Sequence, residues 1–380
     1  MRRAELRERL ADLYAGRPVV LGPGTVAGWA PWVDRLTRLG CPTMVLDLPA
    51  PATVTVTDHV RLHDRLVRDL SPDVVSAVER FDPRCRGLFR TTPYVTSDEP
   101  ILGRPVTGGR PRAYLDLEDK LVAGGVWAAA GVDAAPYRIV PLDDQDALAA
   151  ATRELAGSLG AVWSGDGFTG GGDYVRWVVD DHDRVTARAF FVPRCTRVRV
   201  MPFLDGVPCS VHGFVLPDGV AVLRPVEIAV LRDHAVRTFS YAGLGTGWDP
   251  PAADREEMRD VARRVGEHLR DEHGYRGAFG VDGVLTADGF RPTELNPRMS
   301  AGAHLLTAVD RDFFQLLQAN LLVGVDAGVT VADVEAFLPE MDAERRASVE
   351  LDRPLAPGDR LAARLAAHDE ALEAAPERRS

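Results

Sequence analysis

Residues 277–300 read GAFGVDGVLTADGFRPTELNPRMS, and this stretch decides the fold. An apolar run, Ala278–Thr286, is followed by the glycine-containing turn Ala287–Gly289 and then by a second run, Phe290–Leu295. Two apolar runs joined by a short turn of this kind are typical of a β-hairpin. The sequence therefore predicts a pair of antiparallel strands at this point of the chain.

Three oxygen-bearing side chains lie on this predicted hairpin. With a three-residue turn, Thr286 pairs with Phe290, and Asp282 then lies opposite Glu294. Side chains two residues apart on a strand share a face, so Asn296 joins Glu294. Two carboxylates and an amide oxygen, with no His or Cys among them, suit Mg²⁺ held together with the phosphates of a nucleotide.

Two alternatives stay open for the hairpin. A two-residue turn would shift the register by one residue and move Asp282 off the shared face. The acids are also compatible with a solvated sheet face that has no function. Arg298 and the turn at 300–302 favour the metal site, because both follow at once and suit contact with phosphate.

Lysine is almost absent from the chain, since Lys120 is the only lysine among 45 basic residues. Such a bias toward arginine is typical of a GC-rich genome. A lysine retained under that bias indicates a position where a planar guanidinium cannot replace the compact ammonium group. Lys120 is therefore a candidate phosphate ligand, with chance retention as the alternative.

Composition limits the class of protein. The chain of 380 residues is 46% hydrophobic, which is enough for two or three ordinary cores. Its net charge of −11 argues against nucleic acid as a partner, since phosphate backbones attract basic surfaces. Four scattered cysteines, a charged start (MRRAELRERL) and no apolar run of membrane-spanning length predict a soluble cytoplasmic protein.

Periodicity and turn residues divide the chain into alternating helices and strands. Residues 1–110 read as α/β, with strands at Pro18–Leu21 and Thr43–Leu46, a helix at Trp29–Leu39 and a further strand piece at Val74–Glu79. A helix over Leu115–Ala130 then carries Lys120 in its first turns. Further strands are expected at 136–140, 174–179, 197–203, 211–216, 220–223 and 228–231, and further helices at 143–159, 251–271 and 313–322.

A second phosphate-binding candidate is the segment Ser164–Asp181, SGDGFTGGGDYVRWVVDD. Its glycines predict a flexible loop before a strand at Tyr174–Val179. Consecutive backbone N–H groups in such a loop can hold phosphate, and Ser164 and Thr169 add hydroxyl groups. The alternative is a long hairpin loop that binds no ligand.

In this order the motifs resemble the ATP-grasp superfamily, in particular its carboxylate–amine ligases. LEDKLVAGGVWAAAGVDAAPY (Leu117–Tyr137) is similar to the family's lysine-bearing helix, and MPFLDG (Met201–Gly206) to the hinge that holds adenine. GVDGVLTADGFRPTELNPR is similar to the magnesium hairpin, and MSAGAHL (Met299–Leu305) to the loop beyond it. More loosely, residues 110–180 resemble the peptide ligases of actinobacterial natural-product pathways.

The resemblance implies a division of the chain into four parts. Residues 1–110 are similar to the Rossmann-like domain that precedes ATP-grasp in many members. Residues 111–200 would form the small, lid-like subdomain with Lys120 and the glycine loop. Residues 201–330 would form the large subdomain with the metal site, and 331–380 a C-terminal helical tail.

The resemblance also implies a role for each motif residue. Lys120 would contact the α- or β-phosphate of ATP, two magnesium ions would be held on the hairpin, and Arg298 would steady the transferred phosphoryl group. Arg232 or Arg224 would supply a further cation. The expected ligands of ATP are Lys120, Thr169, Gly170, Gly171, Gly172, Met201, Phe203, Leu204 and Asp205, and the expected metal ligands are Asp282, Glu294 and Asn296.

The chain departs from the family pattern at two places. The family's second lysine, in the strand before the glycine loop, is missing, and Trp163 stands near its position. Arg176 or Arg199 would have to replace it. An acid that binds the ribose usually follows the hinge glycine, but here only Asp205 is near.

The implied function is ATP-dependent formation of an amide between a small-molecule carboxylate and an amine through an acyl phosphate. His212 and His304 are possible bases or substrate contacts, or ordinary structural histidines. A nicotinamide-dependent oxidoreductase is one alternative, because Val19–Trp29 carries a glycine turn between a strand and a helix and Asp47 ends the next strand. A nucleotide-binding module without catalysis is another. The oligomeric state stays open, with a homodimer as one alternative.

Overall fold

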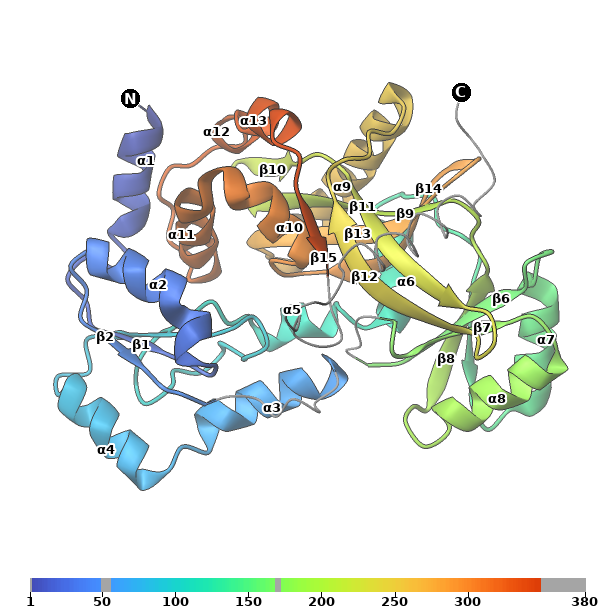
Figure 1. Cartoon of the computed structure of the whole chain (residues 1–380), viewed down its shortest axis with the longest axis horizontal. Helices are drawn as coiled ribbons and strands as arrows, with labels where there is room; N and C mark the ends of the chain where they lie inside the picture. Colours follow the sequence, from blue (N-terminus) through green and yellow to red (C-terminus); the bar gives the residue numbers. More distant parts are fainter. Residues whose placement is uncertain (1, 49–55, 168–171, 350–380) are drawn as a thin grey trace, which may run out of the picture.

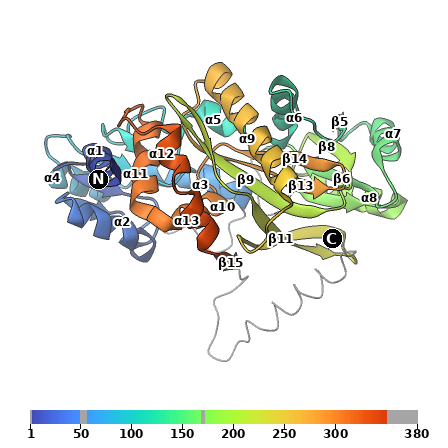
Figure 2. The ribbon, with the colours of Figure 1, turned by 90° about the horizontal axis from the view of Figure 1, so that it is seen from above.

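The computed structural model describes residues 2–48, 56–167 and 172–349. Within these residues the strands form three sheets. Figure 1 shows an N-terminal domain at the left, a large central sheet and a small sheet at the right. The view from above in Figure 2 places the N-terminal domain and the small sheet at opposite ends of the molecule. Helices and strands are mixed along the chain, in agreement with the predicted α/β (α+β) class.

The N-terminal sheet is parallel and has the strand order β2-β1-β3-β4. It confirms the strands predicted near residues 18–21 and 43–46. The strands are β1 (Val19–Leu21), β2 (Thr43–Val45), β3 (Leu88–Arg90) and β4 (Val106–Thr107), and the helices of this part are α1 (Arg2–Ala11), α2 (Val26–Arg38), α3 (Val56–Arg68) and α4 (Pro72–Phe81).

The strand piece predicted at Val74–Glu79 is wrong, because these residues lie in α4. Ser71 is the N-cap, and its Oγ accepts a hydrogen bond from the Val74 backbone N–H at 3.4 Å. Pro72, at the first helical position, has the φ that a helix requires and no N–H to leave unsatisfied. These two signals favour the start of a helix. They outweigh the β-branched residues, which suggested a strand.

The single helix predicted over Leu115–Ala130 is two helices, α5 (Arg112–Asp116) and α6 (Lys120–Ala129). Asp119 caps α6, since its side chain accepts a hydrogen bond from the Leu121 backbone N–H at 2.9 Å. The interruption makes Lys120 the first residue of α6, where it is buried.

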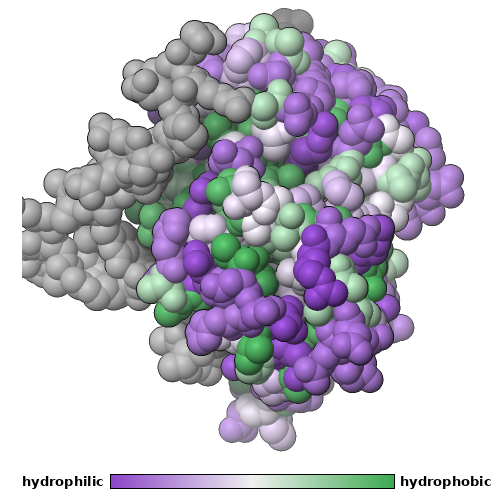
Figure 3. Space-filling view, turned by 90° about the vertical axis from the view of Figure 1, so that its right-hand side faces the viewer, coloured by the Kyte–Doolittle hydropathy of each residue, from purple (hydrophilic) through white to green (hydrophobic). Residues whose placement is uncertain are grey.

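The small sheet is antiparallel, in the order β5-β8-β6-β7. Its strands are β5 (Arg138–Pro141), β6 (Ala161–Gly165), β7 (Val175–Val178) and β8 (Arg197–Pro202), so the boundary expected at residue 200 lies within β8. Helices α7 (Gln145–Leu155) and α8 (Asp181–Phe191) pack on it around Trp163 and Phe191. Figure 3 looks onto this end of the molecule, where hydrophilic residues predominate.

Helix α8 is absent from the sequence-based prediction, although a start signal is present. Asp180 is its N-cap, and the carboxylate accepts a hydrogen bond from the Asp183 backbone N–H at 2.8 Å. Periodicity alone does not reveal this cap, because it directly follows an apolar strand and lies in a run of acids.

The large sheet has the order β14-β13-β9-β11-β12-β15, and β10 pairs with β9. Helix α9 (Ala252–His273) packs on one face, while α10 (Ala301–Leu306), the short 3₁₀ helix Thr307–Asp310 and α11 (Arg311–Leu322) lie on the other. The strands are β9 (Val207–Leu216), β10 (Gly219–Val222), β11 (Val226–Asp233), β12 (Thr238–Gly245), β13 (Gly277–Thr286), β14 (Gly289–Asn296) and β15 (Ala347–Val349).

The tail expected to be helical from residue 331 is helical only at first. Helices α12 (Val331–Glu335) and α13 (Leu338–Ala343) are followed by the strand β15, which pairs with β12. Residues 350–380 lie outside the described residues.

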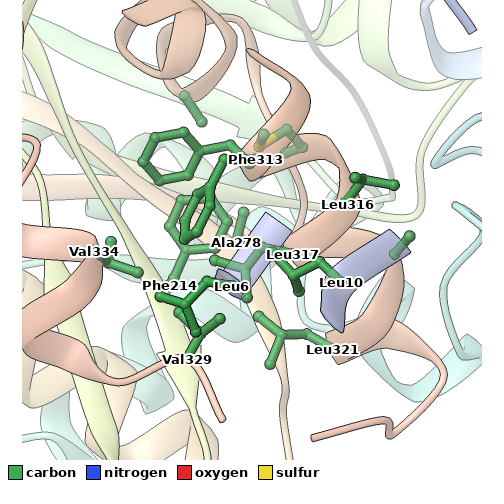
Figure 4. Packing of buried hydrophobic residues seen from close by; sticks show 14 of the residues in the cluster. Leu6, Leu10, Phe214, Ala278, Phe313, Leu316, Leu317, Leu321, Val329 and Val334 are labelled. Carbon is green, nitrogen blue, oxygen red and sulfur yellow. The ribbon is translucent and has the colours of Figure 1, made fainter. Parts of the chain in front are cut away.

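One hydrophobic core joins the N-terminal helices to the large sheet. Leu6 and Leu10 of α1 pack with Leu317 and Leu321 of α11, next to Phe214 of β9 (Figure 4). All of these side chains are buried. The N-terminal domain is therefore held against the face of the large sheet that also carries α10 and α11.

Candidate active site

The hairpin β13–β14 has the expected pairing, but its turn is shorter than predicted. Thr286 pairs with Gly289, so the loop has two residues instead of three. A bulge between Asp282 and Gly283 adds a residue to the opposite strand and returns Asp282 to Glu294. The predicted opposition of the two acids is thus confirmed for a different reason.

Polar residues line one face of three neighbouring strands. Ser210 of β9 pairs with Asp282 of β13, which pairs with Glu294 of β14. In the next row, His212 and Asn296 lie on the two sides of Gly280, a residue without a side chain. Residues two apart share a face, so all five polar side chains project together.

Asp282 is held by two hydrogen bonds. Ser210 Oγ donates to Asp282 Oδ1 at 2.5 Å, and Asn296 Nδ2 donates to Asp282 Oδ2 at 2.9 Å. Burial and the neighbouring Glu294 nevertheless raise the pKa of Asp282 to about 6. A carboxylate that is difficult to ionise beside a second carboxylate is a site where a cation would be stabilising.

Arg298 extends this network to Glu118. Its Nη2 donates to Asn296 Oδ1 at 2.9 Å, and its Nε donates to Glu118 Oε1 at 2.9 Å. Arg110 Nη1 lies 2.5 Å from Glu118 Oε2. Burial alone would disfavour the charge on Glu118, but Arg298 and Arg110 lower the pKa of this carboxyl group to about 2.

The charge of Glu118 therefore orients Arg298, which leads to a prediction for Glu118→Gln. We expect a loss of about 2 kcal/mol of stability at pH 7, because two buried arginines lose their counter-ion. The lowered pKa means that this contribution is complete above the ordinary carboxyl value and disappears as the pH falls toward 2. Urea unfolding of both proteins between pH 7 and pH 3 measures it.

The exposed Asp116, which pairs with Arg112 at 3.0 Å, is a matched control for that experiment. Asp116→Asn should change stability by about 0.5 kcal/mol or less. A difference between wild type and Glu118→Gln that stays constant with pH would contradict the assignment.

Lys120, the first residue of α6, contacts the same cluster. Its Nζ is 3.1 Å from Glu294 Oε2, and 5% of its side chain is exposed, against 21% for Glu294. The only lysine in the sequence thus contacts a predicted metal ligand rather than solvent.

The donor set formed by Asp282, Glu294 and Asn296 fits Mg²⁺. Carboxylate and amide oxygens are the ligands that this ion prefers in proteins. Burial and, after it, the neighbouring Glu294 raise the pKa of Asp282, and a divalent cation would offset the repulsion between the two acids. Within the described residues no group of three His, Cys, Asp or Glu side chains could hold a metal, so the amide of Asn296 is needed as a third ligand.

His212 of β9 is a buried, neutral ring next to the hairpin. Burial, together with Arg298 and His304, lowers its pKa to about 3. Ser210 Oγ lies 3.2 Å from its Nε2, whereas His212 Nδ1 and Ser300 Oγ have no hydrogen-bond partner among the described residues. His212 therefore contacts Ser210, which in turn holds Asp282.

The close approach of α10 to His212 requires glycine at position 302. A Cβ atom there would lie 2.2 Å from His212 Cε1. We therefore expect Gly302→Ala to lower the free energy of unfolding by about 1–3 kcal/mol, measured by urea denaturation. The control is Gly125→Ala in α6, where an added Cβ meets nothing within 4 Å and should stabilise by about 0.5–1 kcal/mol. Equal effects at the two positions would contradict this packing.

Arg199, one of the two arginines considered as a replacement for the missing second lysine, lies on β8 beside Lys120. It pairs across the small sheet with Ser164, and Met201 shares its face, whereas Trp163 points to the core between the sheet and α7. Its guanidinium donates to the Lys120 carbonyl at 2.9 Å and to the Thr293 carbonyl at 2.8 Å. Of the two arginines considered, Arg199 therefore lies at the cluster.

The second arginine considered, Arg176, lies elsewhere. Its guanidinium carbon is 3.5 Å from the centre of the Phe190 ring on the small domain. Arg224, offered as a further cation, is buried and paired with Asp249 at 2.6 Å and Asp342 at 3.3 Å. Both arginines are thus committed to structural contacts.

The hinge between the small and large sheets carries an aromatic cluster. Phe203 lies 5.1 Å from Trp177 and 6.3 Å from Phe239, measured between ring centres. The Arg232 guanidinium lies 5.0 Å from the centre of the Phe203 ring. The structure therefore brings Arg232 to Phe203, in the segment expected to hold adenine, where Asp205 is exposed.

The glycine loop is only partly described. Thr169, Gly170 and Gly171 lie outside the described residues. Gly172 has a φ of +87°, and a Cβ atom there would lie 2.6 Å from the Phe239 carbonyl oxygen, so the end of the loop packs on β12.

The N-terminal glycine turn, the basis of the oxidoreductase alternative, packs against its own helix. Trp29 Nε1 donates to the Pro23 carbonyl at 3.2 Å, and a Cβ atom on Gly24 would lie 2.8 Å from that nitrogen. The indole ring thus covers the backbone that would have to approach a dinucleotide pyrophosphate.

The fold and the cluster together define a class of protein. A parallel N-terminal sheet, a small antiparallel sheet with a glycine loop, and a large sheet whose hairpin carries Asp282, Glu294 and Asn296 are the parts expected of an ATP-grasp enzyme. Among helices of the described residues, none has both the length and the apolarity that a bilayer crossing needs.

Solved structures of known enzymes share this architecture. N5-carboxyaminoimidazole synthase from Aspergillus clavatus, in complex with ADP and 5-aminoimidazole ribonucleotide, matches with a TM-score of 0.55 and 14% identity, over 84% of this chain and 80% of its own. L-amino acid ligase from Bacillus licheniformis matches with a TM-score of 0.54 and 14% identity, over 85% and 77%. Phosphoribosylamine–glycine ligase from Thermotoga maritima matches with a TM-score of 0.53 and 15% identity, over 86% and 74%.

These neighbours are ATP-grasp enzymes, so the present chain has the ATP-grasp fold that its motifs predicted. The likeness establishes the fold. No protein-family model matches the chain, and no curated protein matches it by sequence.

Proposed function

We propose that this protein is an ATP-dependent ligase that joins a carboxylate to an amine and releases ADP and phosphate. The observation that carries the proposal is the convergence of Asp282, Glu294 and Asn296 on one sheet face, with Lys120 and Arg298 in contact with them. Acids that hold a divalent cation, placed beside cations that contact phosphate oxygens, are the parts that phosphoryl transfer requires.

ATP would lie between the small and large sheets. Met201, Phe203 and Leu204 would line the adenine slot, with Asp205 near the ribose. Lys120 and Arg199 would contact phosphate oxygens, and the loop Thr169–Gly172 would close over the β- and γ-phosphates. Two Mg²⁺ ions on Asp282, Glu294 and Asn296 would neutralise charge on the phosphates.

The reaction has two steps. A carboxylate oxygen of the substrate attacks the γ-phosphorus, and the bond between that phosphorus and the bridging oxygen of ADP breaks, which yields an acyl phosphate. The neutral amine of the second substrate then attacks the acyl carbon. The carbon–oxygen bond to phosphate breaks, and the amine proton passes to solvent.

The residues of the chain act in these steps by position and charge. Arg298, oriented by Glu118, would stabilise the phosphoryl oxygens as negative charge redistributes. Lys120 would exchange its contact with Glu294 for a phosphate oxygen. Neutral His212 would keep Ser210 and Asp282 in place.

The names of the structural neighbours support the same chemistry, since two of the three are called ligases and one acts on L-amino acids. By analogy, we propose an amino acid or a peptide-like acid as the carboxylate substrate. A role in natural-product biosynthesis, a cytoplasmic location and a homodimer complete the proposal.

Product analysis tests this function. Purified protein is incubated with Mg·ATP and pooled amino acids, with and without hydroxylamine, and the nucleotides are separated. ADP and phosphate that appear only with substrate, together with a hydroxamate in the presence of hydroxylamine, would support an acyl phosphate. AMP and pyrophosphate would refute it in favour of adenylation, and binding of ATP without turnover on any amine would favour a non-catalytic module.

A further inference from the structure

A second site lies between the N-terminal domain and the large sheet. A cavity of about 510 Å³ is lined by Gly24, Trp29 and Trp32 on the N-terminal side, and by Met299, His304 and Gln315 on the other. The glycine turn after β1 forms part of its wall. Met299 follows Arg298 directly in the chain, so the cavity adjoins the expected phosphate end of the active site.

The cavity is positively charged. Arg35, Arg90 and Arg311 line it, and among its described lining residues none is acidic. Arg35 is already neutralised, because Asp312 lies 2.8 Å from its guanidinium. Burial lowers the pKa of His304 to about 4, and the charges of Arg311, Arg90 and Arg298 contribute to this shift.

Arg90 is the unusual member of this set. Its side chain is buried, with 6% of the residue exposed, yet its Nε and Nη1 atoms have no hydrogen-bond partner among the described residues. Its polar neighbours are both uncharged: Nη2 makes one long hydrogen bond, 3.5 Å to Gln315 Oε1, and the Tyr14 hydroxyl also interacts with the guanidinium. Its guanidinium carbon lies 4.1 Å from the centre of the Trp32 ring.

The surroundings are shaped to admit this guanidinium. A Cβ atom on Gly108 would lie 2.4 Å from the Thr91 carbonyl oxygen and 2.5 Å from Arg90 Nη1, so the guanidinium packs directly on this glycine. Burying a charge without a counter-ion is costly, and burial lowers the pKa of Arg90. A buried arginine with free donors at the wall of a cavity is therefore prepared for an anion that the protein itself does not supply.

We propose that Arg90 binds an anionic group of the substrate, a carboxylate or a phosphate, while an apolar part of the same molecule packs on Trp29 and Met299. This inference rests on the proposed ligase function, because Met299 in the wall of the cavity directly follows Arg298. It assigns the substrate class: an acidic molecule with an apolar body, recognised by charge in the N-terminal domain.

Binding without ATP tests this inference separately from catalysis. The probes are 3-phenylpropionate, phenyl phosphate and the neutral 3-phenylpropanamide, titrated against intrinsic tryptophan fluorescence, since Trp29 and Trp32 line the cavity. We expect one of the two anions to bind about 10-fold or more tightly than the amide. Which of them binds more tightly distinguishes a carboxylate from a phosphate site. Equal affinity for anion and amide would overturn the inference, whether or not ADP forms with any substrate.

Three variants assign the effect to Arg90. Arg90→Met should weaken anion binding by about 10- to 100-fold and leave thermal stability unchanged or higher, because an unpaired buried charge is removed. Arg90→Lys should retain part of the anion preference. Arg35→Met is the matched control, since Arg35 lines the same cavity but is already paired, and Asp312 keeps Arg38 at 2.7 Å. It should change affinity by about threefold or less.

A purely structural role for Arg90 predicts the opposite pattern. Arg90→Met would then lower the melting temperature and leave the anion affinity of the folded protein unchanged. That result, or an equal loss of affinity in Arg35→Met, would overturn the assignment.

Discussion

Glu294→Gln is expected to lower the rate of ADP formation by about 100-fold or more at saturating ATP. Glutamine keeps the shape of the side chain but removes the charge that faces Asp282 across the hairpin and contacts Lys120. The metal would then be held by one carboxylate instead of two. A coupled ADP assay over a range of Mg²⁺ concentrations measures the effect, and the Mg²⁺ requirement should rise with the loss of rate.

The control for this variant is another glutamate at the same hairpin. Glu257 of α9 is exposed and lies beside Gly289 in the β13–β14 turn, away from the polar face. Glu257→Gln should leave the rate and the Mg²⁺ requirement unchanged. Wild-type turnover and Mg²⁺ dependence in Glu294→Gln would remove the hairpin from the proposed mechanism.

Lys120→Met should have an effect of similar size, about 100-fold on ADP formation, because the phosphates lose a buried cation. The variant should also lose about 1–3 kcal/mol of stability, since Glu294 loses its partner at 3.1 Å. Lys120→Arg should restore the stability better than the rate, because a guanidinium can still pair with Glu294 but does not replace the compact ammonium group at the phosphates. ADP assays and urea denaturation of the two variants separate the roles.

The scarcity of lysine provides an independent control for this prediction. Lys120 is the only lysine of the chain, so an amine-directed reagent can modify the Lys120 side chain and the terminal amine alone. Mass spectrometry should find Lys120 protected when Mg·ATP is present, and the terminal amine equally labelled in both conditions. Equal labelling of Lys120 with and without Mg·ATP would contradict its contact with phosphate.

The sequence was sufficient for the hairpin and for the placement of its polar residues on one face. Alternation along β13 and β14 is local, so Asp282, Glu294 and Asn296 could be placed on one face before any tertiary contact was known. The turn length was predicted incorrectly, because a two-residue turn and a bulge together give the same opposition of acids as a three-residue turn. Local patterns determine which side chains share a face of the sheet. They do not determine the turn length or the position of a bulge.

Contacts between distant parts of the chain determined the rest. Glu118 and Arg298 are 180 positions apart, and Arg90 and Gln315 are 225 apart, so neither pair has a local signal. In a chain where nearly every cation is arginine, the sequence alone could not distinguish Arg199 at the cluster from Arg176 on Phe190. The sequence by itself determined the class of fold and the acids of the hairpin, because strand periodicity is a property of neighbouring residues. Only the packing of the N-terminal domain against α10 and α11 decided which arginines are buried without a counter-ion, because burial depends on every element that surrounds a side chain.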